Sequence, residues 1–218
     1  MQATIKNTVR FDGVGLHSGR PVRMVISPAS AGYGIWFKRT DIRFGDAMVP
    51  ARWDAVDRSP LCTRIRNAAG VEVSTIEHVM AALAGCGIHN ALIEIDGPEM
   101  PIMDGSAAPF VFLIQSAGIQ EQNVPKQFIR IKQVIEVHDG DKWARFEPFE
   151  GFKVTFSIDF DHPILKSSSQ SASIDFSTAS FMKEISRART FGFLQDVEAL
   201  QDAGLARGGS LDNAIVMD

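Results

Sequence analysis

The stretch STIEHVMAALAGCGIHNALIEI, residues 74–95, places a helix directly before a buried strand. Apolar residues recur at helical spacing at Ile76, Val79, Met80 and Leu83. Gly85 and Gly87 supply the stop signal of that helix. The next apolar run, Ala91–Ile95, is short and rich in residues that favour strands, which predicts a buried strand. The stretch therefore indicates an α+β fold.

Strands precede this helix and a second helix follows it. Residues 22–26 and 35–37 alternate at the two-residue period that is typical of strands with one buried face. Asp104-Gly105-Ser106 opens a second helix, which ends at Gly118. We expect residues 1–119 to form one α+β domain, with a mostly antiparallel sheet packed on helices.

A second domain is expected after a linker. Residues 120–127 contain a proline and few apolar side chains, which predicts the linker. Strands are then predicted again from residue 128, and apolar residues at helical spacing predict a helix from Thr178. Residues 128–218 are thus expected to form a second α+β domain. We expect it to be incomplete, because no helix follows the final apolar run at 214–218 to complete a second core.

The composition excludes several classes of protein. The chain has 218 residues, 45% hydrophobic and 22% charged, which rules out disorder, collagen and coiled coil. A pI of about 5.7 and scattered basic residues argue against nucleic-acid binding. The longest apolar runs are far short of the ~20 residues that a membrane helix needs, and no signal peptide is visible. We expect a cytoplasmic protein, a monomer, with no membrane span.

The sequence Ser74-Thr75-Ile76-Glu77-His78 has two interpretations. In the first, it is a capping box, in which Ser74 caps the helix and Glu77 reaches back to the backbone. In the second, Glu77 is a base and His78 is a metal ligand, because neutral imidazole binds zinc and a neighbouring carboxylate can take a proton from water. A catalytic zinc needs three protein ligands, and no two histidines lie three to five residues apart.

Three other residues could carry chemistry or pack structurally. His17 lies in the glycine-rich turn 13–19, which could bring its backbone close to a ligand but lacks the features of a phosphate-binding loop. His89, at a strand entry, is expected to be a structural histidine. Cys62 is either a thiolate nucleophile or a small buried residue.

Four segments carry a resemblance to a known family: residues 13–19, 74–85, 98–110 and 186–192. In these segments, in this order, and in one register from residue 4 to 218, the chain resembles the UDP-3-O-acyl-N-acetylglucosamine deacetylases, the zinc amidases of lipid A synthesis. The resemblance implies two stacked α+β domains with the active site between them. It also implies hydrolysis of the N-acetyl group of a nucleotide-linked acyl glucosamine, giving acetate and a free amine, with Zn²⁺ as cofactor.

The resemblance also implies roles for single residues. His78 matches a zinc ligand, Glu77 the general base, and Thr190 the hydroxyl that stabilises the tetrahedral oxyanion. Further matches are expected to contact the substrate or line its pocket: His17, Leu61, Cys62, Phe160, Phe191 and Gly192.

The segment 193–218 resembles a β-α-β insert that forms an apolar tunnel for the fatty acyl chain. The expected lining or substrate-binding residues are Leu194, Val197, Leu200, Ala206, Gly209, Ser210, Ala214 and Val216. Each apolar member could instead be an ordinary core residue. A tunnel of this kind would select long chains, because each buried methylene contributes about 0.8 kcal/mol.

The family pattern also contains parts that we do not find in this chain. Its second and third zinc ligands stand in an H-K-x-x-D sequence after the insert, and so do its general acid and a lysine on the phosphate side. We therefore expect either a piece of a longer enzyme or a truncated, catalytically silent module that binds acyl glucosamine. A purely structural scaffold has no feature in its favour. The codons after residue 218 would decide between the first two.

Overall fold

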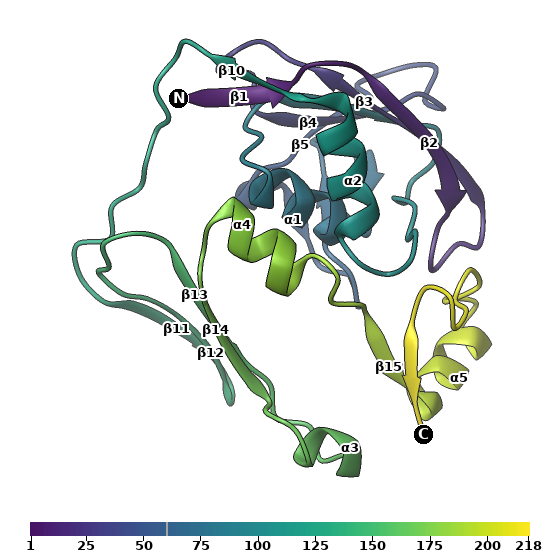
Figure 1. Ribbon diagram of the computed structural model, residues 1–218. Helices are drawn as coiled ribbons and strands as arrows, with labels where there is room; N and C mark the ends of the chain where they lie inside the picture. Colours follow the sequence, from purple (N-terminus) through teal and green to yellow (C-terminus); the bar gives the residue numbers. More distant parts are fainter. Residues whose placement is uncertain (60) are drawn as a thin grey trace. The chain divides into compact units, whose positions relative to one another are not determined.

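The alternating apolar residues near the N-terminus form a five-stranded sheet in the computed structural model, which describes residues 1–59 and 61–218 (Figure 1). Its strands are β2 (Val9–Val14), β3 (Pro21–Pro28), β4 (Ile35–Arg39), β5 (Met48–Pro50) and β9 (Ala91–Ile95). Their order is β2-β3-β9-β4-β5, and β9 runs antiparallel to β3 but parallel to β4.

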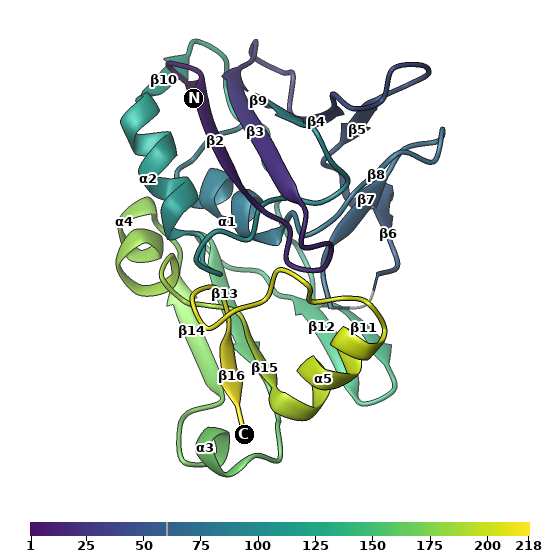
Figure 2. The ribbon, with the colours of Figure 1, turned by 90° about the vertical axis from the view of Figure 1, so that its right-hand side faces the viewer.

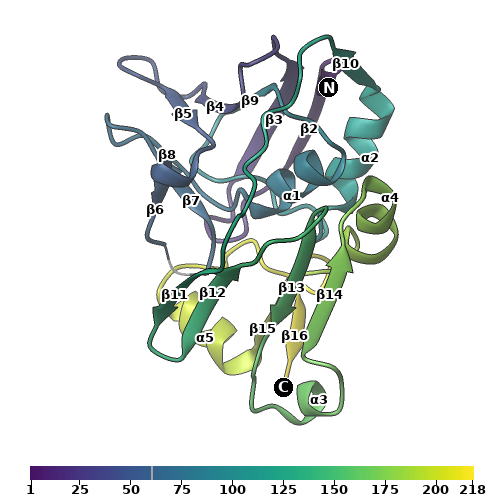
Figure 3. The same ribbon diagram turned by 90° about the vertical axis from the view of Figure 1, so that its left-hand side faces the viewer.

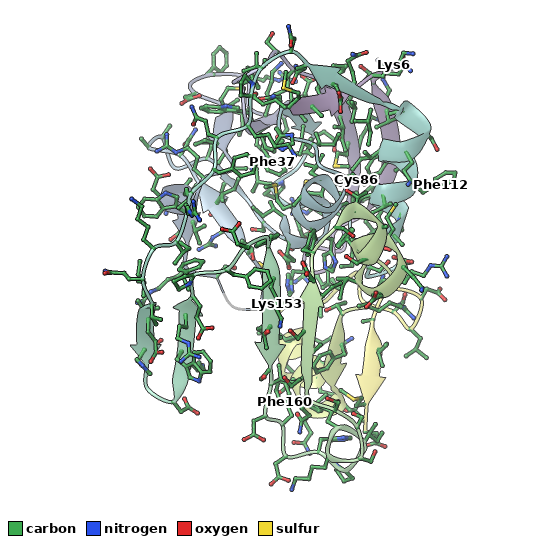
Figure 4. All side chains as sticks on the ribbon, turned by 60° about the vertical axis from the view of Figure 1, so that its left-hand side comes forward. Lys6, Phe37, Cys86, Phe112, Lys153 and Phe160 are labelled. Atoms are coloured by element: carbon green, nitrogen blue, oxygen red, sulfur yellow. The ribbon has the colours of Figure 1, made fainter. Side chains whose placement is uncertain are left out.

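Two helices, α1 (Glu77–Gly85) and α2 (Ala108–Ala117), pack against each other beside this sheet (Figure 2). The ring of Phe110 on α2 meets that of Phe11 on β2 at 5.6 Å. Sheet residues such as Phe37 and Ile93 are fully buried. Figure 4 shows Phe37 and Cys86 inside this part of the chain, whereas Phe112 points outward from α2. The helices and the sheet therefore share one apolar core.

Smaller strands extend this core. The three-stranded sheet consists of β6 (Val56–Asp57), β7 (Arg64–Arg66) and β8 (Glu72–Val73), preceded by a 3-10 turn at Trp53–Ala55. Strand β1 (Gln2–Ile5) pairs antiparallel with β10 (Ile119–Gln122). Residues 120–122 of the predicted linker 120–127 thus belong to a strand, because their backbone groups form a ladder with β1 in place of hydrogen bonds to water.

The last part of the chain has the order β15 (Phe191–Phe193), α5 (Leu194–Asp202) and β16 (Ile215–Met217). The two strands are parallel, with Phe191 opposite Ile215. Figures 1 and 2 show β15, α5 and β16 side by side. The segment is a β-α-β excursion, whose helix connects two parallel neighbours as such a crossover requires.

The chain divides into two compact units. Unit 1 comprises residues 1–125 and 182–218, and unit 2 comprises residues 126–181. The sequence pattern predicts a single second domain over 128–218. The structure instead groups 182–218 with the N-terminal part, because hydrogen bonds join that segment to loops near residues 16 and 105.

Unit 2 consists of two hairpins and short helices (Figure 3). Strand β11 (Ile135–Asp139) pairs with β12 (Lys142–Phe146), and β13 (Lys153–Ser157) pairs with β14 (Ser171–Asp175). The helices of this part are α3 (Pro163–Lys166) and α4 (Thr178–Ser180). A π-helical turn at Phe181–Ile185 continues α4, so the helix predicted from Thr178 exists but is not a regular α-helix.

The α+β class expected from the sequence is confirmed, since helices and mostly antiparallel strands occur together. Among the described residues, no helix is both long and apolar enough to cross a bilayer.

Candidate active site

The N-terminus of α1 presents the Glu77–His78 pair. Glu77 is the first residue of the helix, where a carboxylate is favoured by the helix dipole. Its Oε2 accepts a hydrogen bond of 3.0 Å from the Thr63 amide, which comes from the loop before β7. Ile76, the N-cap residue, makes no side-chain cap. Glu77 is thus held by a distant loop.

The capping-box interpretation of residues 74–77 is therefore wrong. The backbone of Ser74 is part of a bridge: its amide donates to Pro98 O, and its carbonyl accepts from Met100. Between this bridge and the helix, Thr75 has a φ of 59°, in the left-handed region where a β-branched residue is strained. This backbone reversal directs the chain from the bridge into α1, so Ser74 lies too early to cap the helix.

His78 follows Glu77 on the first turn and is half-buried. Burial lowers the pKa of His78, and the carboxylates of Glu77 and Asp104 act in the opposite direction without reversing the shift. The ring is therefore neutral at neutral pH, which is the form that binds a metal ion. The influence of Asp104 also places the loop before α2 close to His78.

The loop that carries His17 is held by a buried carboxylate. Glu99 accepts hydrogen bonds from the amides of His17 (2.7 Å) and Ser18 (2.9 Å) and from the Thr75 hydroxyl (3.3 Å). A Cβ at Gly15 would lie 2.4 Å from Glu99 Oε2, so only glycine fits there. Glu99 thus joins the glycine-rich turn to the residues that precede Glu77.

Cys62 lies beside His17. Burial alone would raise the pKa of Cys62, but hydrogen bonds from His17, Ser59 and the Thr75 amide outweigh it and lower that pKa. The bond with Cys62 is the largest cause that raises the pKa of His17; burial opposes it, and Glu99 adds to it. Leu61, which precedes Cys62, is exposed and has a φ of 58°.

Thr190 is anchored to the loop that contains Asp104. Its amide donates to Gly105 O at 2.8 Å, and its carbonyl accepts from Ile215 at 3.0 Å. The Arg189 guanidinium donates to Asp104 O at 2.8 Å. A Cβ at Gly105 would lie 1.9 Å from Asn213 O, so the two segments touch through backbone. Residues 77–78, 104 and 190 therefore belong to one region of unit 1.

The predicted tunnel residues divide into two groups. Around β15 and α5, Phe191 and Leu194 are exposed, Val197 and Leu200 are half-buried, and a Cβ at Gly192 would lie 3.4 Å from Val197. Around the turn before β16, Ala206 is buried, Ala214 and Val216 are half-buried, and Gly209 and Ser210 are exposed.

Backbone hydrogen bonds tie this excursion to the glycine-rich turn. The Arg207 amide donates to His17 O and the Gly208 amide to Leu16 O, so the loop before β16 reaches His17. Phe160 is the one predicted site residue in unit 2, where its amide donates to Gln170 at 2.8 Å (Figure 4).

The described residues do not by themselves form a complete metal site. Within 1–59 and 61–218, no three His, Cys, Asp or Glu side chains gather closely enough to hold an ion. His78 provides one suitable nitrogen, and zinc sites use at least three protein donors. The donor chemistry at His78 therefore fits zinc, whereas the donor number does not.

Glu99, Asp104, Thr63 and Ser59 are residues that sequence reasoning missed. Glu99 offered a signal, because a carboxylate within the mostly apolar run 98–103 must find donors if it is buried. Thr63 contributes only a backbone amide, which no side-chain pattern reveals.

Comparison with known proteins first defines the class. A family model described as LpxC, UDP-3-O-acyl N-acetylglycosamine deacetylase, matches residues 2–218, which places the chain among the deacetylases. Curated relatives named UDP-3-O-acyl-N-acetylglucosamine deacetylase come from Methylococcus capsulatus (57% identity), Shewanella woodyi (55%) and Vibrio parahaemolyticus (54%). Each alignment covers 100% of this chain and 71% of the relative. The chain belongs to the LpxC family.

Proposed function

We propose that this protein hydrolyses the N-acetyl group of UDP-3-O-acyl-N-acetylglucosamine in lipid A synthesis, with Zn²⁺ as its cofactor. Family membership supports the reaction class. The observation that carries the proposal is the Glu77–His78 pair at the start of α1, with Glu77 held by the Thr63 amide and His78 kept neutral by burial.

In this proposal, Glu77 is the general base. The Thr63 amide engages Oε2, and no other donor among the described residues reaches Oε1. That oxygen can take the proton of the attacking water, a role that usually contributes ~10² to 10⁴-fold in rate. The helix N-terminus and the Thr63 hydrogen bond keep the carboxylate oriented.

His78 is proposed as one zinc donor, with further donors needed to close the site. When bound, zinc would polarise the acetyl carbonyl and acidify water. Thr190 is proposed to donate a hydrogen bond from its hydroxyl to the oxyanion that develops on the acetyl carbonyl oxygen. The backbone bonds to Gly105 and Ile215 fix Thr190 for this purpose.

The test is acetate release from the UDP-linked substrate by the protein expressed from its complete gene. Glu77→Gln should lower turnover ~10² to 10⁴-fold while the melting temperature changes little. Glu121→Gln, an exposed carboxylate on β10, is the matched control and should retain full turnover. Unchanged turnover per folded molecule in Glu77→Gln would contradict the proposal. A wild-type protein that shows no turnover in the presence of zinc would also contradict it. If that protein still binds the substrate, the result would favour the catalytically silent binding module.

We also propose that the β15-α5-β16 segment holds the acyl chain. Val197→Trp adds bulk beside Gly192, where even an added Cβ would reach van der Waals contact with Val197 at 3.4 Å, and a packed apolar passage tolerates added bulk poorly. Substrates with long acyl chains should lose affinity, whereas short-chain analogues should bind nearly as before. Equal losses for both, together with a lower melting temperature, would show that Val197 is a packing residue.

A further inference from the structure

Glu99 is a buried carboxylate that the proposed reaction does not use. The residue is 4% exposed. The donors that it meets among the described residues are all neutral: the amides of His17 and Ser18 and the hydroxyl of Thr75. Burial of a carboxylate costs free energy unless hydrogen bonds surround it. Its three donors come from two segments of unit 1, so the carboxylate fixes these segments relative to each other.

The backbone on either side of Glu99 holds the residue that precedes Thr75. The amide of Ser74 donates to Pro98 O at 2.9 Å, and the carbonyl of Ser74 accepts from the Met100 amide at 3.0 Å. Thr75 itself is 2% exposed, and its hydroxyl donates to Glu99 Oε1 at 3.3 Å. The segment around Glu99 therefore binds Ser74 through backbone and Thr75 through a side chain.

Thr75 has a backbone conformation that needs such support. Its φ of 59° lies in the left-handed region, which costs free energy for a β-branched residue and persists only where the surroundings fix it. Two residues later, α1 begins at Glu77. The direction in which the chain leaves Thr75 thus sets the position of the Glu77 side chain.

Thr63 contacts the two residues that follow this reversal. Its carbonyl accepts from the Ile76 amide at 3.3 Å, and its amide donates to Glu77 Oε2 at 3.0 Å. Both hydrogen bonds depend on the conformation of Thr75, because a rotation there would displace the residues after it. The same rotation would move Glu77 away from the amide that orients it.

We propose that Glu99 is a positioning residue for Glu77 in the proposed deacetylation. It acts through the Thr75 hydroxyl, which it holds by Oε1, and so maintains the backbone reversal that presents Glu77 to the attacking water. This inference rests on the proposed role of Glu77 as general base. If Glu99 served packing alone, its loss would lower stability without changing the turnover of the molecules that remain folded.

The first experiment changes only the side chain of Thr75, in the protein expressed from its complete gene and supplied with zinc. Thr75→Val keeps the branched shape but removes the donor, whereas Thr75→Ser keeps the donor and is the matched variant. Turnover per folded molecule should fall about 10- to 100-fold in Thr75→Val with KM little changed, because a displaced base affects mainly the transition state. Thr75→Ser should stay within about threefold of wild type. No loss in Thr75→Val, equal losses in both variants, or a change confined to KM would overturn the proposal.

The second experiment tests whether Glu99 acts through that hydroxyl. Glu99→Gln should lower turnover per folded molecule at least about fivefold, whereas Glu94→Gln, which changes a more exposed carboxylate on β9, should leave it unchanged. In the Thr75→Val background, Glu99→Gln should cost less than in wild type, because residues that act through one contact are not additive. Fully additive losses, or no loss in a folded Glu99→Gln, would contradict the proposal. If Glu99→Gln does not fold, the two Thr75 variants still decide.

The third experiment does not depend on activity, so a failure of the proposed function stays distinguishable from a failure of this inference. Hydrogen exchange of the Thr63 amide, followed by NMR, reports its hydrogen bond to Glu77. That amide should exchange at least about tenfold faster in Thr75→Val than in wild type, while it changes little in Thr75→Ser and the amides of β9 change little in either variant. An unchanged Thr63 amide, or an equal acceleration in β9, would show that the contact between Glu99 and Thr75 does not position Glu77.

Discussion

Unit 1 and unit 2 are built from the same alternating pattern but differ in what covers their strands. In unit 1, Phe37 and Ile93 are 0% exposed, because the sheet packs with α1 and α2. In unit 2, Phe156 is 68% and Trp143 61% exposed, although both lie on regular strands. The alternating pattern therefore predicts that a strand forms. The elements that pack against the strand decide how much of its apolar area is buried, and hence how much free energy it contributes to stability.

The difference in burial between the two units bears on the candidate active site. Glu77, His78, Thr190 and Cys62 all lie in unit 1, on loops and helix ends that its buried core supports. Catalytic groups need such support, because small displacements reduce their contribution to the rate. Isolated two-stranded hairpins are at best marginally stable.

The largest expected difference comes from truncating one phenylalanine in each unit. Phe37→Ala removes a fully buried ring and should lower the free energy of unfolding by about 3 to 5 kcal/mol. Phe156→Ala removes an exposed ring and should change it by less than about 0.5 kcal/mol. Urea unfolding followed by circular dichroism measures both. Equal losses would show that the hairpins of unit 2 are packed as tightly as the sheet.

A smaller effect is expected where the two segments of unit 1 touch. Gly105→Ala places a Cβ against Asn213 O at a residue with a φ of 81°, and should cost about 2 to 4 kcal/mol. Gly32→Ala has nearly the same φ, 78°, but meets open space, so it should cost only about 1 kcal/mol. Thermal unfolding of the two variants separates crowding from backbone strain. Similar costs would mean that the Gly105 contact is not part of the folded core.

Substitution of the buried carboxylate of Glu99 should cause the next largest loss of stability. Glu99→Gln replaces one of the two accepting oxygens by a donating NH2 group, which leaves one of the two backbone N–H groups without an acceptor, and should cost about 1 to 3 kcal/mol. Glu94 is more exposed than Glu99 and forms an ion pair with Lys38. Glu94→Gln removes that pair and should cost less than about 1 kcal/mol. Urea midpoints provide the comparison, and the reverse order would argue against Glu99 as the clamp of the His17 turn.

The smallest effect concerns pH. Hydrogen bonds from the Arg39 guanidinium lower the pKa of Asp41, so the pair stabilises the protein above the unfolded pKa of aspartate. This contribution is lost as the pH falls through the lower folded pKa. Asp41→Asn should therefore be less stable than wild type by at most about 1 kcal/mol at pH 7, and equal to it at the lowest pH where both fold. A difference that persists there would point to packing.

Much of the fold of unit 1 could be predicted from local pattern. The helix after Ile76 and the strand at Ala91–Ile95 follow directly from apolar spacing and stop signals. The strand at 119–122 could not be predicted, because IQEQ is polar and its pairing with β1 joins residues more than a hundred positions apart. Pairing between distant segments leaves no local periodicity.

The contacts of the candidate site are equally hidden from local sequence pattern. Glu77 and His78 attract attention as neighbours in sequence, and the resemblance assigned their roles. The partners that orient them, such as the Thr63 amide, are contributed by other loops, so their part depends on tertiary structure. The capping-box prediction failed for this reason: the S-x-x-E spacing is present, but a bridge to Pro98 and Met100 takes Ser74 out of the helix.

The Thr190 segment belongs to the folded unit that carries Glu77. Native-state hydrogen exchange can test this assignment. The amides of Thr190 and Ile215, which donate to Gly105 and Thr190, should be protected to a degree approaching that of β9 and far more than amides of β13 and β14. Exchange of Thr190 and Ile215 together with the hairpin amides, while β9 stays protected, would contradict it.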